Sequence, residues 1–276
     1  EFIVRTQNGC RLWVNDNEHP LIDGWVRSGR EVELRGAIRL LGGRAYPIRL
    51  EFFKSKEAKE MKAAIELQWK PPHGADGPIP PQDLSPNRFP ETLVIQTAFP
   101  PDDRSLGWER GTTVSKAWDQ AATDAAVEAA TYVTAHLRDL SGVGDNAPDR
   151  PAKLRDFCRR FAERAFRRPL TDGQKRLVVD PYFETAPNPE DAVKRIVLLT
   201  LLSPQFLYRE ADSPLDSYDT ASRLSFALWD SPPDQELLDA AAAGKLGNRE
   251  QVARQAERML PDFRTHAKIL EFLHLW

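Results

Sequence analysis

The chain has 276 residues, which is enough for one to three domains with separate hydrophobic cores. Its 38 Lys and Arg residues are balanced by 41 Asp and Glu, for a net charge of -3, so it lacks the basic field that nucleic-acid binding needs. Its most apolar run, residues 196–202, is much shorter than the about 20 residues of a membrane-spanning helix. We therefore expect neither a nucleic-acid partner nor a transmembrane segment.

The two ends of the sequence suggest a piece of a longer protein. It begins at Glu1 without an initiator methionine or signal peptide, and it ends at Trp276 within an apolar pattern. The only two cysteines, Cys10 and Cys158, fall in different predicted domains, so their number does not decide their redox state. We expect a fragment whose partner modules belong to the same chain.

Residues 1–70 have the alternation of β-strands. Apolar side chains recur at every second position, for example at Tyr46, Ile48, Leu50 and Phe52, and residues 7–9 and 42–43 carry turn signals. Pro47 cannot donate a hydrogen bond to a neighbouring strand, which places its strand at an edge or at a bulge. This pattern predicts an antiparallel β-sandwich, incomplete at its N-terminus.

Residues 71–114 are rich in proline and predict a connector between two domains. From residue 115 onward the apolar period becomes helical, and Gly142 stands where a helix would end. An alanine-rich inner stripe is expected on the first helix, at Trp118, Ala122, Ala125, Ala129, Val133, His136 and Leu140. We interpret His136 as a buried, hydrogen-bonded histidine rather than a catalytic base.

Five further helices have recognisable N-terminal caps, each with a partner residue three positions later. The predicted caps are Thr171, Asn188, Asp216, Ser231 and Asn248. Residues 191–210 form the predicted core helix, with a stop or kink caused by Pro204. Apolar residues lie on every side of it from 196 to 202, which predicts burial all round. The fold class that follows is a two-domain protein, β then α, with an all-α domain over residues 115–276.

The N-terminal motifs, in residues 1–14, 21–25, 46–53 and 67–69, resemble the C-terminal two thirds of the lectin-like β-sandwich named after anthrax protective antigen. In that family, sugar-binding members hold calcium beside the glycan with an aspartate pair that precedes a glycine. The matching positions here are Gln7, Asn8 and Gly9. Calcium prefers carboxylate oxygens, and neither Gln7 nor Asn8 carries a charge, which argues against a calcium-dependent site.

A second set of motifs occurs in one order, in residues 109–119, 164–171, 202–209 and 221–229. These motifs are similar to the uncharacterised helical domains of large secreted planctomycete proteins, which a cytochrome c module often accompanies. The resemblance implies an extracytoplasmic (periplasmic or secreted) location and a role in handling polysaccharide. The haem-attachment motif Cys-x-x-Cys-His is absent from this sequence, so we expect no cofactor in this fragment and any haem in modules outside it.

No catalytic set of residues can be recognised. The sequence has no G-x-S-x-G elbow, no phosphate-binding glycine loop and no H-E-x-x-H motif. The densest carboxylate group, which is centred on Asp102 and Asp103, is interpreted as a turn with helix-terminal charges. Whether the protein is an enzyme therefore stays open at this level.

Two groups of residues are candidates for ligand binding. In the sandwich, the candidates are Gln7, Asn8 and Gly9 of the turn together with Trp13 and Trp25. The two tryptophans have aromatic faces that suit a sugar ring, with core packing as the alternative for each. In the helical half, the motif residues that border any site are Arg167, Arg168, Ser203, Tyr208, Arg209 and Arg223. For these, helix capping and internal ion pairs are the alternative.

Three functional hypotheses follow. The first is a non-catalytic, carbohydrate-binding module on a helical scaffold of a secreted, cytochrome-linked protein, with polysaccharide as its partner. The second is part of an oxidative or hydrolytic enzyme whose active site other modules complete, which requires polar groups that converge on a pocket. The third is a structural spacer between electron-transfer modules.

Overall fold

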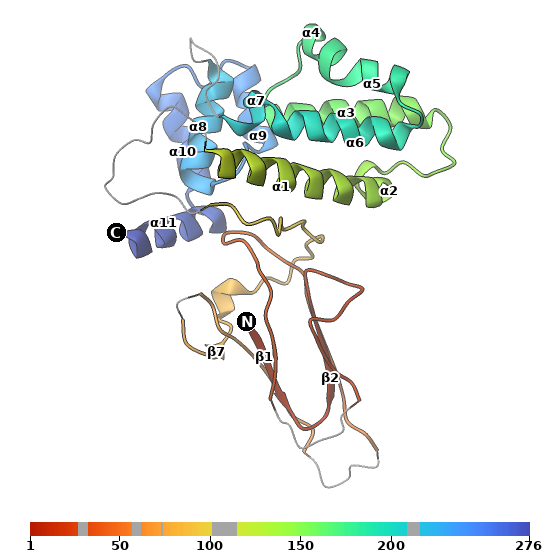
Figure 1. The fold of residues 1–276 in the computed structure, drawn as a ribbon. Coiled ribbons are helices and arrows are strands. Elements are labelled where there is room, and N and C mark those ends of the chain that lie inside the picture. The colour runs from red at the N-terminus through yellow and green to blue at the C-terminus, as the bar shows by residue number, and fades with distance from the viewer. Residues whose placement is uncertain (27–32, 57–61, 73, 101–114, 209–215) are drawn as a thin grey trace. The chain divides into compact units, whose positions relative to one another are not determined.

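A computed structural model describes residues 1–26, 33–56, 62–72, 74–100, 115–208 and 216–276 (Figure 1). The chain divides into two compact units, Glu1–Val94 and Ile95–Trp276. The first is called the β unit below and the second the helical unit.

The β unit contains two antiparallel sheets, as the alternation predicts. One sheet has the order β4 (Glu33–Gly36), β1 (Phe2–Thr6), β6 (Ile65–Trp69), β7 (Gly77–Pro78). The other has the order β3 (Ile22–Gly24), β2 (Gly9–Val14), β5 (Ile48–Phe53), and a 3₁₀ turn at Pro81–Asp83 follows β7. The core is built from inward side chains of both sheets: Phe2, Val4, Cys10, Leu12, Val14 and Ile22.

Strand β5 lies at the edge of its sheet among the described strands, as Pro47 leads one to expect. Its residues Ile48 and Phe52 pair with Val14 and Cys10 of β2 and therefore share the face that carries the core. They are nevertheless 40% and 36% exposed, because the core face is only partly covered beside this edge.

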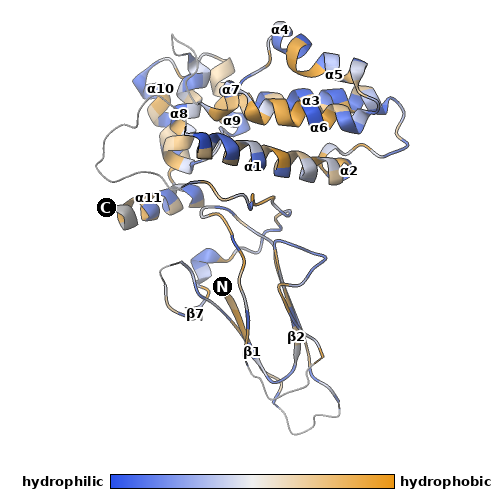
Figure 2. Ribbon diagram, viewed as in Figure 1, coloured by the Kyte–Doolittle hydropathy of each residue, from blue (hydrophilic) through white to orange (hydrophobic). Residues whose placement is uncertain are grey.

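The helical unit is organised around α6 (Pro189–Leu202), against which α1 (Lys116–Ala135) and α3 (Arg150–Phe166) pack. The short α2 (Leu137–Ser141) follows α1. Helix α4 (Asp172–Gln174), a π-helical turn (Lys175–Val179) and α5 (Asp180–Thr185) connect α3 to α6. Hydrophobic and polar residues alternate along these ribbons (Figure 2), and the buried core includes Val133, Leu154, Cys158, Val193, Ile196 and Val197.

The expected all-round burial of the core helix is wrong. Ala192, Val193, Ile196, Val197 and Thr200 are buried, but Leu199 and Leu202 on the opposite side are 43% and 37% exposed. Helices α1 and α3 cover only part of the α6 surface, so the sequence run is more apolar than its burial requires. Pro204 does end the helix, because Ser203 adopts an extended conformation and a new short helix, α7 (Pro204–Leu207), begins there.

The predicted alanine stripe of α1 is shifted by about one residue. The buried positions are Ala121, Ala126, Ala130 and Val133, and the helix breaks at His136, which is exposed. Leu140 is 47% exposed, whereas Leu137 is buried in its place. Adjacent alanine pairs at 121–122, 125–126 and 129–130 make two neighbouring stripes almost equally apolar, so the period alone cannot choose between them.

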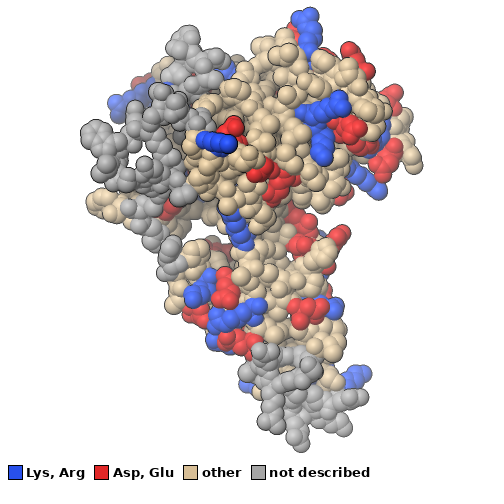
Figure 3. Space-filling view, viewed as in Figure 1, with Lys and Arg blue, Asp and Glu red and all other residues tan. Residues whose placement is uncertain are grey.

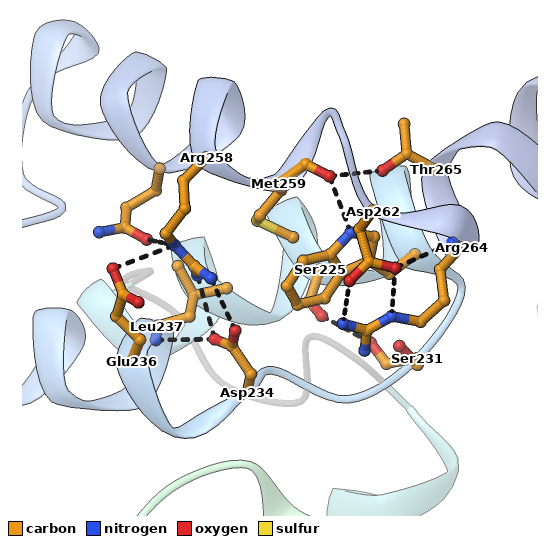
Figure 4. Close-up of polar contacts among 12 residues, drawn as sticks. Ser225, Ser231, Asp234, Glu236, Leu237, Arg258, Met259, Asp262, Arg264 and Thr265 are labelled. Carbon is orange, nitrogen blue, oxygen red and sulfur yellow. Dashed lines mark hydrogen bonds and ion pairs between the residues drawn. The ribbon is translucent and has the colours of Figure 1, made fainter. Parts of the chain in front are cut away.

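A second core joins α8 (Ser217–Trp229), α9 (Gln235–Ala242) and α10 (Arg249–Met259), and α11 (Phe263–Leu275) packs against α8. It is centred on Trp229, Leu237 and Met259, and polar contacts surround it (Figure 4). Arg258 pairs with Asp234 and Glu236.

Among the described helices, none is both long and apolar enough to cross a membrane.

Four of the five predicted N-caps are confirmed, at Thr171, Asn188, Asp216 and Asn248. The prediction at Ser231 is wrong, because the side chain that caps α9 is Asp234, which accepts from the Leu237 N–H at 2.9 Å. Two prolines after Ser231 precede that helix, and the helix begins only after them.

Both cysteines are buried and free, Cys10 in the β unit and Cys158 in α3. Burial raises the pKa of the Cys158 thiol to about 12. This thiol is therefore a packing residue and not a nucleophile.

Candidate functional site

The β unit presents one face of the β3–β2–β5 sheet away from its core. Cys10, Leu12 and Val14 point into the core, so alternation turns Arg11 and Trp13 to the opposite face. The cross-strand neighbours of these two residues on that face are Asp23, Glu51 and Arg49.

At one end of this face, two half-buried aromatic rings lie together. The ring centroids of Trp25 and Phe53 are 4.4 Å apart, and Phe53 covers the backbone of Gly9 so closely that a Cβ there would lie 1.8 Å from the ring. The Arg11 guanidinium lies 5.0 Å from the Trp25 ring centroid and donates to Asp23 at 3.1 Å. We call Arg11, Asp23, Trp25 and Phe53 the Trp25 platform.

Asp23 remains ionised within the platform. The hydrogen bond from Arg11, followed by one from the Trp25 backbone N–H, lowers the pKa of its carboxyl group. The platform therefore combines aromatic surface with one fixed cationic donor and one anionic acceptor.

Trp13, the other predicted aromatic candidate, differs from Trp25. It is only 6% exposed, and the Arg49 guanidinium lies 3.9 Å from its ring centroid. Its indole Nε1 is buried and has no hydrogen-bond partner among the described residues. Of the two tryptophans, only Trp25 thus offers surface to a ligand.

The turn between β1 and β2 contains the three other candidates of the β unit. Gln7 is exposed, whereas Asn8 is 5% exposed and its side chain donates to the Lys62 carbonyl at 2.9 Å. A side chain at Gly9 would displace the Phe53 ring, which occupies that space. Asn8 and Gly9 therefore have structural roles in this turn, and Gln7 is the exposed member.

The helical unit contains a pocket of about 330 Å³ between the end of α3, α4, α7 and the start of α8. Three of the residues that line it are predicted candidates: Arg167, Arg168 and Tyr208. The remaining lining residues are Phe166, Pro169, Thr171, Gln174, Gln205, Asp216, Tyr218, Asp219 and Ser222.

Arg167 fastens α7 to the end of α3. It is 6% exposed, has a left-handed backbone with φ of 60°, and ends α3. Its two terminal nitrogens donate to four backbone carbonyls, those of Ala165, Gln205, Phe206 and Tyr208, at 2.7 to 3.3 Å. The terminal nitrogens of this guanidinium therefore stabilise the backbone of the pocket wall.

Arg168 binds the start of α8. It donates to both oxygens of Asp216 and, at 2.6 Å, to the buried Asp219. The two aspartates also form the capping box of α8. Partial burial acts to raise the pKa of Asp216, but backbone hydrogen bonds from Asp219 and Tyr218 and the charge of Arg168 outweigh it and lower the pKa.

The other predicted residues of the helical unit lie elsewhere. Ser203 is half-buried and caps α7 by accepting from the Gln205 N–H at 3.3 Å. Arg223 is exposed on α8 and does not line the pocket, and Arg209 lies outside the described residues. Tyr208 follows the helix break at Pro204 and is 49% exposed at the pocket.

The sequence predicts no site role for Gln205, Tyr218 and Ser222 of the pocket. It identifies Thr171, Gln174, Asp216 and Asp219 only as capping residues. The capping residues could have indicated the pocket. Where the polar ends of two helices meet, their capping side chains lie close together.

His136 is exposed, which contradicts the predicted burial. Its Nδ1 lies 2.9 Å from the Tyr132 carbonyl and its ring stacks on Tyr132, with centroids 4.1 Å apart.

Asp102 and Asp103 lie outside the described residues. On the face shown in Figure 3, acidic and basic side chains are interspersed.

Comparison with known protein families divides the chain into three matched regions. Residues 1–83 match the PA14 domain, a carbohydrate-binding type of module. Residues 153–210 match PSD5, a protein of unknown function (DUF1595), and residues 215–276 match PSD4, a protein of unknown function (DUF1592). No curated protein and no solved structure matches the chain.

Proposed function

We propose that this chain is a non-catalytic carbohydrate-binding module carried on a helical scaffold, and that the Trp25 platform is its sugar-contacting surface. The PA14 match covers the strands that build the platform. The observation that carries the proposal is the pair of rings, Trp25 and Phe53, held 4.4 Å apart beside an Arg11–Asp23 ion pair.

The chemistry of the platform suits a sugar. Aromatic faces pack against the apolar C–H face of a pyranose ring, while ring hydroxyls need donors and acceptors at its edge. Arg11 and Asp23 supply both, and Phe53 already packs over Gly9 and against Trp25, so less side-chain freedom is lost on binding. Because these four residues offer a complete set of contacts, we expect binding without calcium.

The proposal extends to polysaccharide handling outside the cytoplasm. The platform offers two aromatic rings and one ion pair, so we expect a single contact with a sugar to be weak. A repeating polymer compensates for weak contacts by offering many equivalent ones. The polymer form of the ligand is therefore expected to bind more tightly than the corresponding monosaccharide.

The experiment compares the full chain with Trp25→Ala on a glycan array, in calcium and in a chelator. Trp25→Ala should lose at least about tenfold in affinity, which corresponds to about 1.4 kcal/mol for the lost aromatic contact. The matched control is Trp276→Ala, which removes a tryptophan that is 93% exposed and lies in the helical unit. Circular dichroism of each variant shows that the fold is retained.

A second variant, Arg11→Gln, keeps both rings and removes the charged donor. It should weaken binding less than Trp25→Ala does. If no glycan binds in either condition, or if Trp276→Ala and Trp25→Ala reduce binding equally, the assignment of sugar binding to the platform is wrong.

A further inference from the structure

We propose that the helical unit has a ligand site of its own: the pocket between α3, α4, α7 and α8 binds a neutral, hydroxyl-rich molecule about the size of one sugar residue. The site is independent of the Trp25 platform. It is built jointly by the two regions of unknown function, since residues 166–208 of its lining fall in the PSD5 match and residues 216–222 in the PSD4 match.

The charges of the pocket are already balanced. Arg168 is paired with Asp216 and Asp219, and the terminal nitrogens of Arg167 are bonded to carbonyls. An added phosphate or sulfate would have to displace these carboxylates, and an added cation would have to displace a guanidinium. Both exchanges leave a charge unpaired in a partly buried place, which is costly. A neutral ligand avoids that cost.

The hydrogen-bonding groups that remain are neutral. Ser222 is 3% exposed, and its hydroxyl oxygen is buried and has no hydrogen-bond partner among the described residues. The hydroxyls of Tyr208 and Tyr218 likewise make no hydrogen bond within the described part of the chain. The amide of Gln205 accepts from Gln174 at 3.0 Å and keeps its own N–H groups for another partner.

These groups both donate and accept, which is the pattern that a ligand hydroxyl matches. A buried serine hydroxyl without a partner costs stability, so natural proteins seldom keep one without a reason. A bound hydroxyl would satisfy it.

The walls are suited to a small ring and are held in place before binding. Tyr208, Tyr218, Phe166 and Pro169 contribute apolar surface. The volume of about 330 Å³ is at the lower end of small-molecule pockets, which span about 300 to 1,000 Å³. Arg167, the two capping boxes and the π-helical turn that follows Gln174 fix the surrounding backbone.

Saturation-transfer NMR of the full chain tests the proposal with a panel of probes. The neutral probes are glucose, galactose, mannose, xylose and N-acetylglucosamine, and the anionic probes are glucuronate and inorganic phosphate, the latter observed by its ³¹P line width. All are also measured on Trp25→Ala, in which the platform is impaired. At least one neutral sugar should still receive saturation in Trp25→Ala, and phosphate should not bind.

Ser222→Ala and Tyr208→Phe then locate the binding. Each removes one hydroxyl and should weaken binding about threefold to tenfold, the value of a neutral hydrogen bond. Ser222→Ala should also be at least as stable as the natural chain without ligand, because it removes an unsatisfied polar group. The matched control is Tyr182→Phe, since Tyr182 is half-buried on α5 and does not line the pocket.

Three results would overturn the proposal. One is that no neutral sugar receives saturation once Trp25 is removed. Another is that binding is unchanged in Ser222→Ala and Tyr208→Phe, or is equally reduced in Tyr182→Phe. The third is that phosphate or glucuronate binds and the neutral sugars do not.

Discussion

At the scale of single residues, Trp229 is the clearest structural anchor of the second helical core. It is 2% exposed, its indole N–H donates to the Met259 carbonyl at 3.1 Å, and the Arg264 guanidinium lies 3.7 Å from its ring centroid. The same carbonyl accepts from Thr265 at 2.8 Å. One side chain thus links the end of α8 to the junction of α10 and α11.

We predict that Trp229→Phe lowers the free energy of unfolding by about 2 kcal/mol. The smaller ring leaves a void and loses one hydrogen bond worth about 1 kcal/mol, although Thr265 still satisfies the carbonyl. Urea denaturation followed by circular dichroism measures the change. Trp276→Phe is the control and should stay within about 0.5 kcal/mol, because Trp276 is 93% exposed. Equal losses in the two variants would contradict the assigned role.

The candidate residues show that the sequence gives the chemistry of a side chain but not its surroundings in the fold. Trp13 and Trp25 have the same chemistry, but Arg49 from β5 covers Trp13 while Trp25 keeps an accessible side. That difference follows from the pairing of Trp13 with Arg49 across two strands that are 34 positions apart in the chain at the nearest ends. Alternation reveals which face a residue is on, and it does not reveal what lies above it.

At the scale of elements, the start of α8 combines a capping box with the Arg168 ion pair. The lowered pKa of Asp216 means that its ionised form is favoured in the folded chain. Its contribution to stability is therefore fully present above the pKa of the unfolded aspartate, near pH 4, and is lost as pH falls through the lower folded value. We expect the stability of the chain to fall with acid in this window.

Asp216→Asn tests this expectation, since asparagine still caps a helix but has no charge. At pH 7 the variant should be less stable than the natural chain, by roughly 0.5 to 1 kcal/mol for a partly exposed pair. Between pH 5 and pH 3 its stability should decline less steeply, which urea midpoints at each pH measure. Asp239→Asn, an exposed aspartate of α9, provides the control. Parallel curves for the natural chain and Asp216→Asn would show that Asp216 does not contribute.

Helix boundaries could be predicted where the determinant is local. The Thr171 and Asp216 caps bind backbone groups within three residues of themselves, so sequence spacing suffices to find them. Burial could not be predicted in the same way. The shifted stripe of α1 and the exposed Leu199 of α6 both depend on which face of the helix its neighbours cover, and the sequence within a helix does not specify that face.

At the scale of the whole molecule, the order of a β domain before an α domain follows from the change of apolar period near residue 115. The pocket of the helical unit could not be found that way. Its lining comes from residues 166–174, 205–208 and 216–222, and Arg167 and Arg168 connect these segments by hydrogen bonds to the two that follow. Both arginines were candidates, but their partners are known only from the fold.

The separation of the cores leads to a last prediction. The core of the β unit is drawn from residues 2–79, and the two helical cores from residues 130–259, with no residue in common. Because each unit buries its own apolar surface, we expect residues 1–94 and 95–276 to fold when produced separately. The sum of their circular dichroism spectra should equal that of the full chain, and each should unfold cooperatively.

A cut inside the helical unit is the matched control. Residues 95–208 lack α8, so Arg168 loses Asp216 and Asp219 and the pocket loses one wall. This piece should unfold at a lower temperature than residues 95–276, because a paired charge and the adjoining packing are removed together. If residues 95–208 were as stable as residues 95–276, the contacts across the pocket would add nothing to the fold. If residues 1–94 were unfolded alone, the β unit would depend on the rest of the chain for its fold. Carbohydrate binding would then have to be tested with the full chain.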